Sequence, residues 1–535
     1  MAPSDEANQA AEYTRYCPGA EHVKISDAVC HGRRRVNYPK CRGCPFNDDE
    51  RDPVDAAPAP EQLPPEVVGR LTHTEDAEMD SVFHAYDVRA TYPEPLNEDV
   101  AWRIGHASAQ FLRSLLGGYE RGDKRANSVV VGHDMRASSP ALAGALIEGI
   151  TSTGTDVIDI GMIDTPQIYF AVNHLGCCGG IQTTASHNPA QYNGFKICGL
   201  KGRPIGRETG LDDIRRIATV IGRHETGTTA AVRTEDLAVA YRKFIRGFLK
   251  DVPPTKAVID ASNGMAGRWF PIVFEDCPGL DIAAMNFEHD GTFVHEPNPL
   301  VEENLAALRQ AVVAQQADFG ACFDVDADRC MFVDGDGQIV PCDLLTALLA
   351  PMFLRQDPGS SIVYDLRSSR VVPEEIAKAG GVPVRQRVGH VFMKKALRDS
   401  KGIFGGELSG HFYFRDNWYC DSGLLAFVSV LNLLGQAGKP LGELIAPLRR
   451  YVSSGERNFK NDDKDGTISR LADRYADAEV DFLDGITVQY PDWWFNVRPS
   501  NTEPLLLLNA EAKNQKILDK HLTELAPLLG EPVEH

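Results

Sequence analysis

Short apolar runs of strand length alternate with helical patterns through most of this chain, and this alternation limits the possible folds more than any other feature. It occurs in three successive blocks. The runs are SVVVGHD, DVIDIGM and GGIQTTAS in the first block, KAVIDASNG, DIAAMNF and FGACFDVDAD in the second, and SIVYDLRSS, PVRQRVGH and IFGGELSGH in the third. Each run leads into a turn rich in Gly, Ser, Asp or His, and ligands of α/β sheets bind beyond the carboxyl ends of the strands. The pattern predicts three successive mixed α/β domains whose loops face one central cleft.

The two ends of the chain have other patterns. From residue 453 the runs GITVQY, WWFNVRPS and PLLLLNAEA read as strands, and a helix closes the chain, so we expect a smaller α+β domain there. Near the start, a Cys-rich extension is followed by the Pro- and acid-rich stretch NDDERDPVDAAPAPEQLPPEVV, which is typical of a linker. The predicted parts are an extension 1–50, a linker 51–80 and domains 81–245, 246–342, 343–452 and 453–535.

Composition narrows the class of protein. The 535 residues exceed what one core usually organises, and 43% hydrophobic with 24% charged residues is typical of a folded soluble protein. The net charge of -20 argues against nucleic acid or an anionic membrane as the main partner. No apolar run reaches the roughly 18 residues of a membrane span, and no secretory layout opens the chain, so we expect a cytoplasmic protein. The eight cysteines outside the extension are expected to be buried thiols.

An acidic cluster follows a strand in the stretch FDVDADR. It places Asp324, Asp326 and Asp328 at alternate positions, and three carboxylates this close repel one another unless a cation lies between them. Hard oxygen ligands suit Mg²⁺. A solvated acidic turn is the alternative, whereas an EF-hand is excluded because its spaced Gly and terminal Glu are missing.

A second cluster, RPSNTEP, lies between two apolar strands and contains Arg498, Ser500, Asn501 and Thr502. The guanidinium offers a bidentate fork, and hydroxyl, amide and backbone N–H groups can surround a phosphate. The same residues are also ordinary turn formers, so the motif by itself leaves both interpretations open.

Two further turns carry polar side chains with open alternatives. GGELSGH presents Glu407 and Ser409, which suit hydrogen bonds to vicinal hydroxyls, although a glycine-rich turn with a surface Glu fits equally. RVGH adds His390, and a lone histidine is more often structural. Arg89 and Arg136 each follow a strand-like run, where a salt-bridged surface arginine is the simpler interpretation.

A serine and a histidine stand side by side in TTASHNPAQYNGFK. No G-x-S-x-G elbow surrounds Ser186, and Pro189 restricts Asn188 to an extended or turn conformation. An unactivated serine hydroxyl is a poor nucleophile, and capping a helix is its alternative role. Beside an Mg²⁺ triad, a phosphate loop and a hydroxyl-binding loop, however, the serine favours phosphoryl transfer on a sugar.

Taken together, the motifs resemble one family, the α-D-phosphohexomutases, and within it the bacterial phosphomannomutase/phosphoglucomutase branch. The resemblance runs from about Phe83 to the C-terminus and leaves the first 80 residues outside. Its motifs stand in order: AYDVRATYPEPLNEDVAWRIG, TTASHNPAQYNGFKI, FDVDADRC, RVGHVFMKKAL, GGELSGHFYFRDNWYCDSG and WWFNVRPSNTEP.

The resemblance implies a phosphoserine enzyme that interconverts mannose 6-phosphate and mannose 1-phosphate, and glucose phosphates as well, through a 1,6-bisphosphosugar. That bisphosphosugar would serve as activator, and the protein would be a monomer or homodimer. A phosphoglucosamine mutase and a catalytically weakened phosphosugar-binding member are the alternatives.

The implied roles fall into four groups. Mg²⁺ would be held by the phosphoserine oxygen and the triad, that is Ser186, Asp324, Asp326 and Asp328, with Arg329 supporting the transferring phosphoryl group. The other catalytic groups would be His187, Lys196, Arg89, His390 and His411. Substrate would bind to Arg367, Glu407, Ser409, Arg498, Ser500, Asn501 and Thr502.

The chain departs from the family at three positions. Val325 replaces the usual glycine between the first two metal aspartates, and a β-branched residue resists φ > 0. We therefore expect either the geometry of that loop or its metal affinity to differ, although all three ligands remain. Ala90 and His133 replace a glycine and an arginine.

The extension carries its own candidate site. A short segment without an apolar core needs a metal ion or another cross-link to fold, and four cysteine thiolates can bind zinc. An iron–sulfur cluster and an unstructured tail are the alternatives, and His22 or His31 could replace one thiolate. The cysteines are Cys17, Cys30, Cys41 and Cys44.

Overall fold

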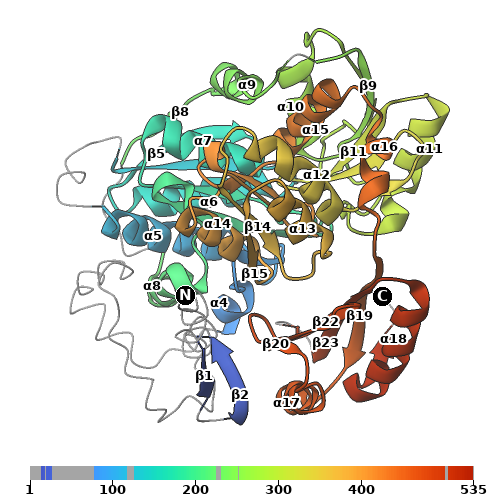
Figure 1. Ribbon diagram of the computed structural model, residues 1–535. Coiled ribbons are helices and arrows are strands. Elements are labelled where there is room, and N and C mark those ends of the chain that lie inside the picture. Colours follow the sequence, from blue (N-terminus) through green and yellow to red (C-terminus); the bar gives the residue numbers. More distant parts are fainter. Residues whose placement is uncertain are drawn as a thin grey trace, which may run out of the picture.

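The computed structural model describes residues 14–17, 20–26, 77–116, 126–223, 230–250, 252–500 and 504–533. These residues form four large sheets with their helices, and a separate pair of strands, β1 (Thr14–Cys17) and β2 (Ala20–Ser26). Figure 1 shows the first three sheets together in the upper part of the molecule and the fourth, drawn in red, at the lower right. The expected class of three mixed α/β domains followed by an α+β domain is confirmed.

The first domain has a six-stranded sheet in the order β3-β7-β6-β4-β5-β8. Its central strand is apolar on both sides: Val129 and Val131 pack into one buried cluster and Val130 into another, so helices cover both faces. The strands are β3 (Val88–Thr91), β4 (Ser128–His133), β5 (Asp156–Met162), β6 (Gly179–Thr183), β7 (Tyr192–Gly199) and β8 (Val232–Thr234). The helices are α4 (Ala77–Val82), α5 (Glu98–Ser114), α6 (Ser139–Thr151), α7 (Thr165–Leu175), α8 (Leu211–Val220) and α9 (Ala238–Arg246).

The second and third domains each contain a five-stranded sheet, in the orders β10-β9-β11-β12-β13 and β15-β14-β16-β17-β18. The second is built from β9 (Thr255–Asp260), α10 (Met265–Phe274), β10 (Leu280–Met285), α11 (Ala306–Ala314), β11 (Phe319–Phe323), β12 (Cys330–Asp334) and β13 (Ile339–Val340). The third is built from α12 (Cys342–Leu354), β14 (Ser361–Asp365), α13 (Val371–Lys378), β15 (Val382–Gln386), α14 (His390–Asp399), β16 (Phe404–Gly406), β17 (Phe412–Phe414), β18 (Cys420–Asp421), α15 (Gly423–Ala437) and α16 (Leu441–Ile445).

The three α/β sheets share one strand arrangement. In the neighbour series β5-β4-β6-β7, β10-β9-β11-β12 and β15-β14-β16-β17, the first two pairings are parallel and the third is antiparallel. The loop joining the last two strands therefore occupies the same topological position in each domain. These loops are residues 184–191, 324–329 and 407–411, and they carry the serine, acidic and hydroxyl-binding motifs.

The fourth domain is an antiparallel sheet in the order β20-β21-β22-β23-β19-β24. Its last helix buries Leu518, Leu522, Leu525 and Leu529, a helical spacing that gives one apolar stripe against the sheet. The elements are β19 (Val452–Lys460), α17 (Lys464–Arg474), β20 (Glu479–Asp481), β21 (Ile486–Gln489), β22 (Trp493–Pro499), β23 (Leu505–Ala512), α18 (Gln515–Leu529) and β24 (Glu531–Val533).

Two expectations about composition can be compared with the described residues. All eight cysteines from Cys177 to Cys420 are free and buried there, as predicted. No single helix among these residues is long and apolar enough to cross a membrane, and one pair, Gly423–Ala437 with Leu441–Leu448, meets that test only together and with a bend of 86°.

Candidate active site

Ser186 lies in the loop that joins β6 to β7, and it does not cap a helix, because the loop leads into a strand. Its side chain is 1% exposed and its φ is +50°, a left-handed conformation that is uncommon for residues other than Gly. The hydroxyl Oγ donates to Asp324 Oδ2 at 3.0 Å. The serine loop of the first domain thus places the Ser186 hydroxyl against the acidic loop of the second domain.

The acidic loop is buried. Asp324, Asp326 and Asp328 each offer an oxygen, and these three atoms lie within 4.8 Å of one another. Lys196 Nζ lies 2.7 Å from Asp326 Oδ2 and 2.5 Å from Asp328 Oδ2. Because burial and the other two carboxylates oppose ionisation, the pKa of Asp324 is raised well above its usual range. The predicted cluster is therefore present, and Lys196, with Arg329 Nε at 3.8 Å from Asp324 Oδ2, balances part of the charge of its three carboxylates.

These residues fit a divalent cation. Within the described part of the chain, Asp326 Oδ1 and Asp328 Oδ1 are buried and have no hydrogen-bond partner. Buried carboxylate oxygens are normally paired or bound to a metal, and Mg²⁺ is held by few carboxylates at a time. Asp324, Asp326, Asp328 and the Ser186 oxygen are the groups that would hold it.

Two basic side chains flank the serine. His187 Nδ1 is 3.4 Å from Ser186 Oγ, and burial, with Arg329 and Arg89 nearby, lowers the pKa of His187 well below its ordinary value. Arg89 NH1 donates to Asn188 Oδ1 at 2.6 Å, in the serine loop itself. A neutral imidazole and a fixed guanidinium thus stand beside the hydroxyl.

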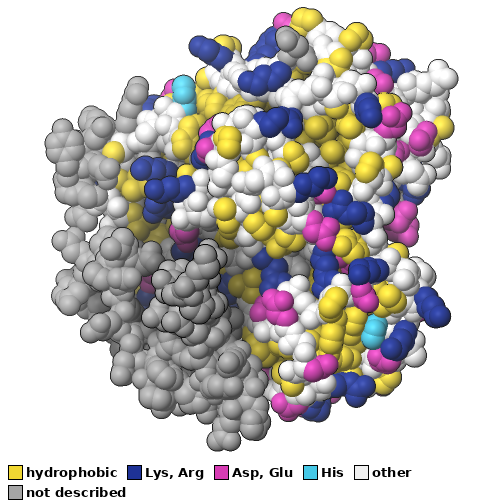
Figure 2. Space-filling model, viewed as in Figure 1, with side chains coloured by type: hydrophobic (Ala, Val, Ile, Leu, Met, Phe, Trp, Pro, Cys, Tyr) yellow, Lys and Arg dark blue, Asp and Glu magenta, His cyan; other side chains and the backbone are white. Residues whose placement is uncertain are grey.

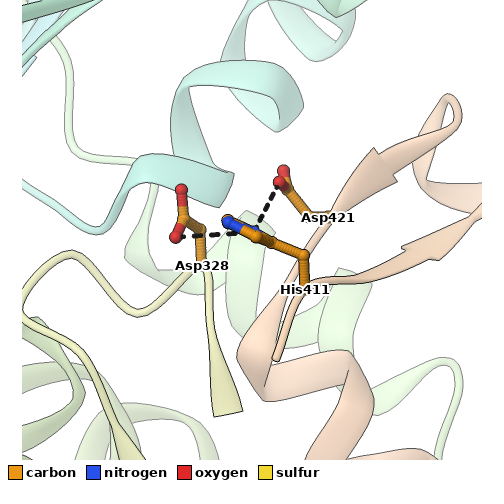
Figure 3. A group of neighbouring side chains, drawn as sticks. All are labelled: Asp328, His411 and Asp421. Carbon is orange, nitrogen blue, oxygen red and sulfur yellow. Dashed lines mark ion pairs between the residues drawn. The ribbon is translucent and has the colours of Figure 1, made fainter. Parts of the chain in front are cut away.

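A relay of charged groups joins the second and third domains (Figure 3). Arg329 Nε donates to His411 Nε2 at 3.1 Å, so a neutral His411 ring carries its proton on Nδ1. That atom lies 3.0 Å from Asp421 Oδ2 and 3.7 Å from Asp328 Oδ1. Lys394 Nζ lies 2.8 Å from Asp421 Oδ1, and both side chains are fully buried. These contacts orient the His411 ring so that Nε2 accepts the hydrogen bond from Arg329 while Nδ1 faces Asp421.

The hydroxyl-binding loop is tied to the same region. Glu407 is 1% exposed and accepts from the Gly389 N–H at 2.9 Å and from the Tyr413 hydroxyl at 2.5 Å. Ser409 is half-buried in the same loop. His390, next to Gly389, stacks on His411 with 6.1 Å between ring centroids, and burial together with Lys394 lowers the pKa of His390 well below its usual value.

The fourth domain reaches this region through arginines. Figure 2 shows Lys and Arg side chains gathered where the lower domain meets the part above it. Arg498 NH2 donates to Glu456 Oε2 at 2.9 Å, and Arg367 NH1 lies 3.8 Å from the same oxygen. Arg367 is held in turn by Asp365, whose Oδ2 also accepts from the Leu408 N–H. Two candidate phosphate-binding arginines therefore face one carboxylate.

The structure brings most of the predicted site residues into one network, with three qualifications. Arg498 lies near the end of β22 and Ser500 directly follows that strand. Asn501 and Thr502 lie outside the described residues. Cys30, Cys41 and Cys44 also lie outside them, and of Cys17 only the backbone is described, in β1.

The structure shows no positive φ at Val325, the feature on which the expectation of a different loop geometry rested. Among described residues other than Gly, the acidic loop has positive φ at Ala327, with φ +56°, and not at Val325. Val325 is fully buried and its carbonyl accepts from the Met265 N–H at 2.7 Å. The valine therefore meets no backbone penalty at this position.

The four parts of the chain each match a family model. The models are Phosphoglucomutase/phosphomannomutase alpha/beta/alpha domain I at residues 80–223, domain II at 244–337 and domain III at 341–451, and the C-terminal domain at 456–528. The chain belongs to the phosphoglucomutase/phosphomannomutase family. The resemblance expected from the motifs is thereby confirmed, and the order of domains is that of the family.

Individual relatives of this family agree. A protein named Phosphohexose mutases from Xanthomonas campestris pv. campestris (strain B100) is 38% identical over 454 residues, which are 84% of this chain and 98% of the relative. Phosphomannomutase of Escherichia coli (strain K12) is 38% identical over 462 residues, 84% of this chain and 99% of that protein. The crystal structure of a phosphoglucomutase/phosphomannomutase family protein from Burkholderia thailandensis has a TM-score of 0.75 and 34% identity, covering 84% and 97% of the two chains.

Sequence reasoning missed several residues of the network. Tyr413 and Asp421 lie within the motif GGELSGHFYFRDNWYCDSG, but its pattern assigns them no role, and Glu456 is a single polar residue in a stretch without a motif. Lys394 does carry a sequence signal, because it follows His390 by four positions in α14 and residues at i and i+4 share a helix face. Arg136 is salt-bridged to Asp134, as one interpretation of the sequence had it, but it is not on the surface, because it is 1% exposed.

Proposed function

We propose that this protein is a phosphomannomutase, interconverting mannose 6-phosphate and mannose 1-phosphate, and glucose phosphates as well, through a phosphoserine and a 1,6-bisphosphosugar. The observation that carries the proposal is the contact of Ser186 Oγ with Asp324 Oδ2 at 3.0 Å. A serine buried among three carboxylates is poorly placed to attack an anionic phosphate unaided. It is well placed to carry a phosphoryl group whose charge a cation and basic residues share.

The reaction has two mirrored halves. The phosphoryl group on Ser186 Oγ passes to the free hydroxyl of a hexose monophosphate, so that the P–Oγ bond breaks, a P–O bond to the sugar forms and the hydroxyl proton leaves. After the bisphosphosugar has turned end for end, Ser186 Oγ takes the other phosphoryl group and a proton returns to the sugar oxygen. Atoms and charge balance over the cycle, and no outside oxidant or nucleotide is consumed.

The residues divide this work by their positions. We assign proton transfer to His411, whose Nδ1 lies 3.0 Å from Asp421 Oδ2; its Nε2 accepts from Arg329 and would take up the hydroxyl proton once Arg329 donates to the transferring phosphoryl group instead. Lys196, Arg329, Arg89 and His187 surround the transferring group. The Mg²⁺ held by the three aspartates and the serine oxygen would supply Lewis-acid stabilisation of the phosphoryl charge.

Substrate recognition is assigned to the third and fourth domains. Glu407 and Ser409 bind ring hydroxyls, with His390 beside them. Arg498, Ser500, Asn501 and Thr502, with Arg367, hold the phosphate that does not react. Because Glu456 already pairs with Arg498 and approaches Arg367, an incoming phosphate would replace a carboxylate at these arginines.

Other expectations remain proposals of the same kind. We propose the domain limits 81–245, 246–342, 343–452 and 453–535, a cytoplasmic location, a bisphosphosugar activator and a monomeric or homodimeric state. Zinc bound by the four cysteines of residues 1–50 is proposed on their spacing alone.

The experiment is a coupled assay of the full chain with Mg²⁺ and a trace of hexose 1,6-bisphosphate. Mannose 1-phosphate, glucose 1-phosphate and glucosamine 1-phosphate are supplied separately. We expect mannose 1-phosphate to give the highest kcat/KM. Preference for glucosamine 1-phosphate would favour the phosphoglucosamine mutase alternative, and no product from any of the three would reject the proposal in favour of a binding protein.

A further inference from the structure

Arg136 follows β4 in the first domain and its side chain is 1% exposed. None of the roles assigned above uses it. An arginine this deeply buried needs acceptors for all its N–H groups, since an unpaired buried charge is strongly destabilising. The acceptors of Arg136 lie almost entirely in the backbone of the loop that carries Ser186.

Each N–H of this guanidinium meets an acceptor. NH2 donates to the carbonyl oxygens of Ser186 at 2.7 Å and Asn188 at 2.6 Å. NH1 donates to those of Pro189 at 2.7 Å and Tyr192 at 3.0 Å. Since a guanidinium has five N–H groups in a rigid plane, these four bonds leave only Nε, which donates to Asp134 Oδ2 at 3.1 Å.

The loop needs such a partner. Ser186 has φ +50°, a conformation that costs energy for a residue with a side chain and persists only where the surroundings enforce it. Without Arg136 the carbonyls of Ser186, Asn188 and Tyr192 would also lose this side-chain donor, whereas that of Pro189 would still accept from the Tyr192 N–H at 3.0 Å. Arg136 supplies the donors and so opposes relaxation of the serine.

A second contact fixes the guanidinium from outside the loop. Asp134 also accepts from the Thr184 hydroxyl at 2.7 Å, and Thr184 Oγ1 accepts from the Ser186 N–H at 3.0 Å. On the other side, the ring of Phe293, from the second domain, lies 5.4 Å from the Arg136 guanidinium carbon. The support of the serine loop thus includes a residue of the domain that carries the acidic loop.

We propose that Arg136 is the positioning residue of the Ser186 loop. It holds four backbone carbonyls so that Ser186 Oγ stays directed at Asp324 and at the substrate. This inference rests on the proposed function, because it assigns Arg136 to the phosphoryl transfer rather than to folding alone.

The test compares Arg136→Lys with the wild type in the full chain. Lysine keeps the charge but has three N–H groups at one point, so it cannot satisfy four carbonyls. We expect kcat for mannose 1-phosphate to fall about 100-fold, the effect of displacing a reacting group by roughly 1 Å. KM should stay within about 2-fold, because the sugar-binding side chains are untouched. In the phosphorylated variant, a larger share of the phosphate should be lost to water as inorganic phosphate.

Arg113→Lys is the matched control. Arg113 is in the same domain and also donates to a backbone carbonyl, that of Thr153 at 3.0 Å, but it does not contact the serine loop. It should keep the wild-type kcat. Wild-type kcat per folded molecule in Arg136→Lys, with only a lower Tm, would overturn the inference and leave the proposed function intact. An inactive wild type would instead reject the proposed function.

A second variant covers the case in which Arg136→Lys does not fold. Phe293→Leu keeps the five hydrogen bonds and removes the ring beside the guanidinium. We expect faster loss of phosphate from Ser186 to water, about 3-fold, with an unchanged KM. An unchanged rate of phosphate loss would count against the positioning role.

Discussion

Replacing Lys394 by methionine should destabilise the third domain far more than any surface charge change. The Lys394 ammonium and the Asp421 carboxylate form a 2.8 Å ion pair, and both side chains are fully buried. Lys394 Nζ also donates to the Tyr169 hydroxyl of the first domain at 3.0 Å. Among the residues that the structure describes, the carboxylate of Asp421 has His411 Nδ1, at 3.0 Å, as its remaining ion-pair partner in Lys394→Met.

The magnitude follows from the burial. Removing one member of a buried ion pair costs about 3–5 kcal/mol, because the other charge is left uncompensated. The pKa of Asp421 is held well below its usual range against the opposing effect of burial, by Lys394 and His411, so the carboxylate remains charged at neutral pH. Replacing both partners removes both charges, and Lys394→Met combined with Asp421→Asn should therefore recover about half of the loss or more.

Hydrogen exchange measured by mass spectrometry reports the stability of each segment separately. It therefore suits a chain of several domains that need not unfold in one step. Peptides covering α14 and β18 should exchange about 10²- to 4 × 10³-fold faster in Lys394→Met, since each 1.4 kcal/mol is a factor of ten. Lys395→Met is the matched control, because Lys395 pairs with Asp399 on the surface, where such pairs contribute about 0–1 kcal/mol. Equal, small effects of the two variants would refute the reasoning, as would a double variant as unstable as the sum of its parts.

Three further outcomes are expected. Removing divalent cations with a chelator should lower turnover more than about 100-fold and added Mg²⁺ should restore it; full activity in chelator would contradict the metal assignment. Tyr413→Phe removes one of the two hydrogen bonds that hold the Glu407 side chain. Since a lost hydrogen bond costs about 1–1.5 kcal/mol, KM for mannose 1-phosphate should rise about 5- to 10-fold while kcat stays within 2-fold. An unchanged KM would show that Tyr413 does not orient Glu407. The hydrogen bond to Asp260 raises the pKa of His295 in the folded protein. The pair therefore stabilises the fold fully below about pH 6.5, the pKa of histidine in the unfolded chain. This stabilisation is lost as the pH rises through the raised pKa of the folded state. His295→Gln should therefore lower Tm more at pH 6 than at pH 8.5, and the reverse order would contradict the assignment.

The sequence predicted those parts of the molecule whose signals are local. Apolar runs of strand length marked three α/β domains, and the turn after a strand marked the loops of Ser186, Asp324 and Glu407, because all three are hairpin connections at one position of a repeated sheet. The three aspartates were recognisable for a physical reason, since so many carboxylates at alternate positions repel one another without a cation.

Other parts depend on contacts that sequence spacing does not reveal. Arg136 and the carbonyl of Ser186 are 50 positions apart, and Lys394 and Asp421 are 27 apart, so their pairing appears only after the strands have assembled. The premise of the Val325 expectation, a positive φ at that residue, is not met for a related reason. The turn in the acidic loop takes its positive φ two residues later, at Ala327, and residue identity alone does not tell which position bends.

The most direct test of the account follows the phosphate on the protein by an isotope label and by intact mass. Mixed with excess mannose 1-phosphate, protein that carries labelled phosphate on Ser186 should pass the label to the hexose phosphate yet still carry one phosphate by intact mass, because Ser186 takes back the other phosphoryl group in each cycle. Ser186→Ala should carry no phosphate and form no bisphosphosugar, yet bind mannose 1-phosphate within about 2-fold of the wild type, because the sugar and phosphate groups bind elsewhere. Phosphate found on another residue, or turnover by Ser186→Ala, would contradict the assignment of Ser186 as the phosphoryl carrier.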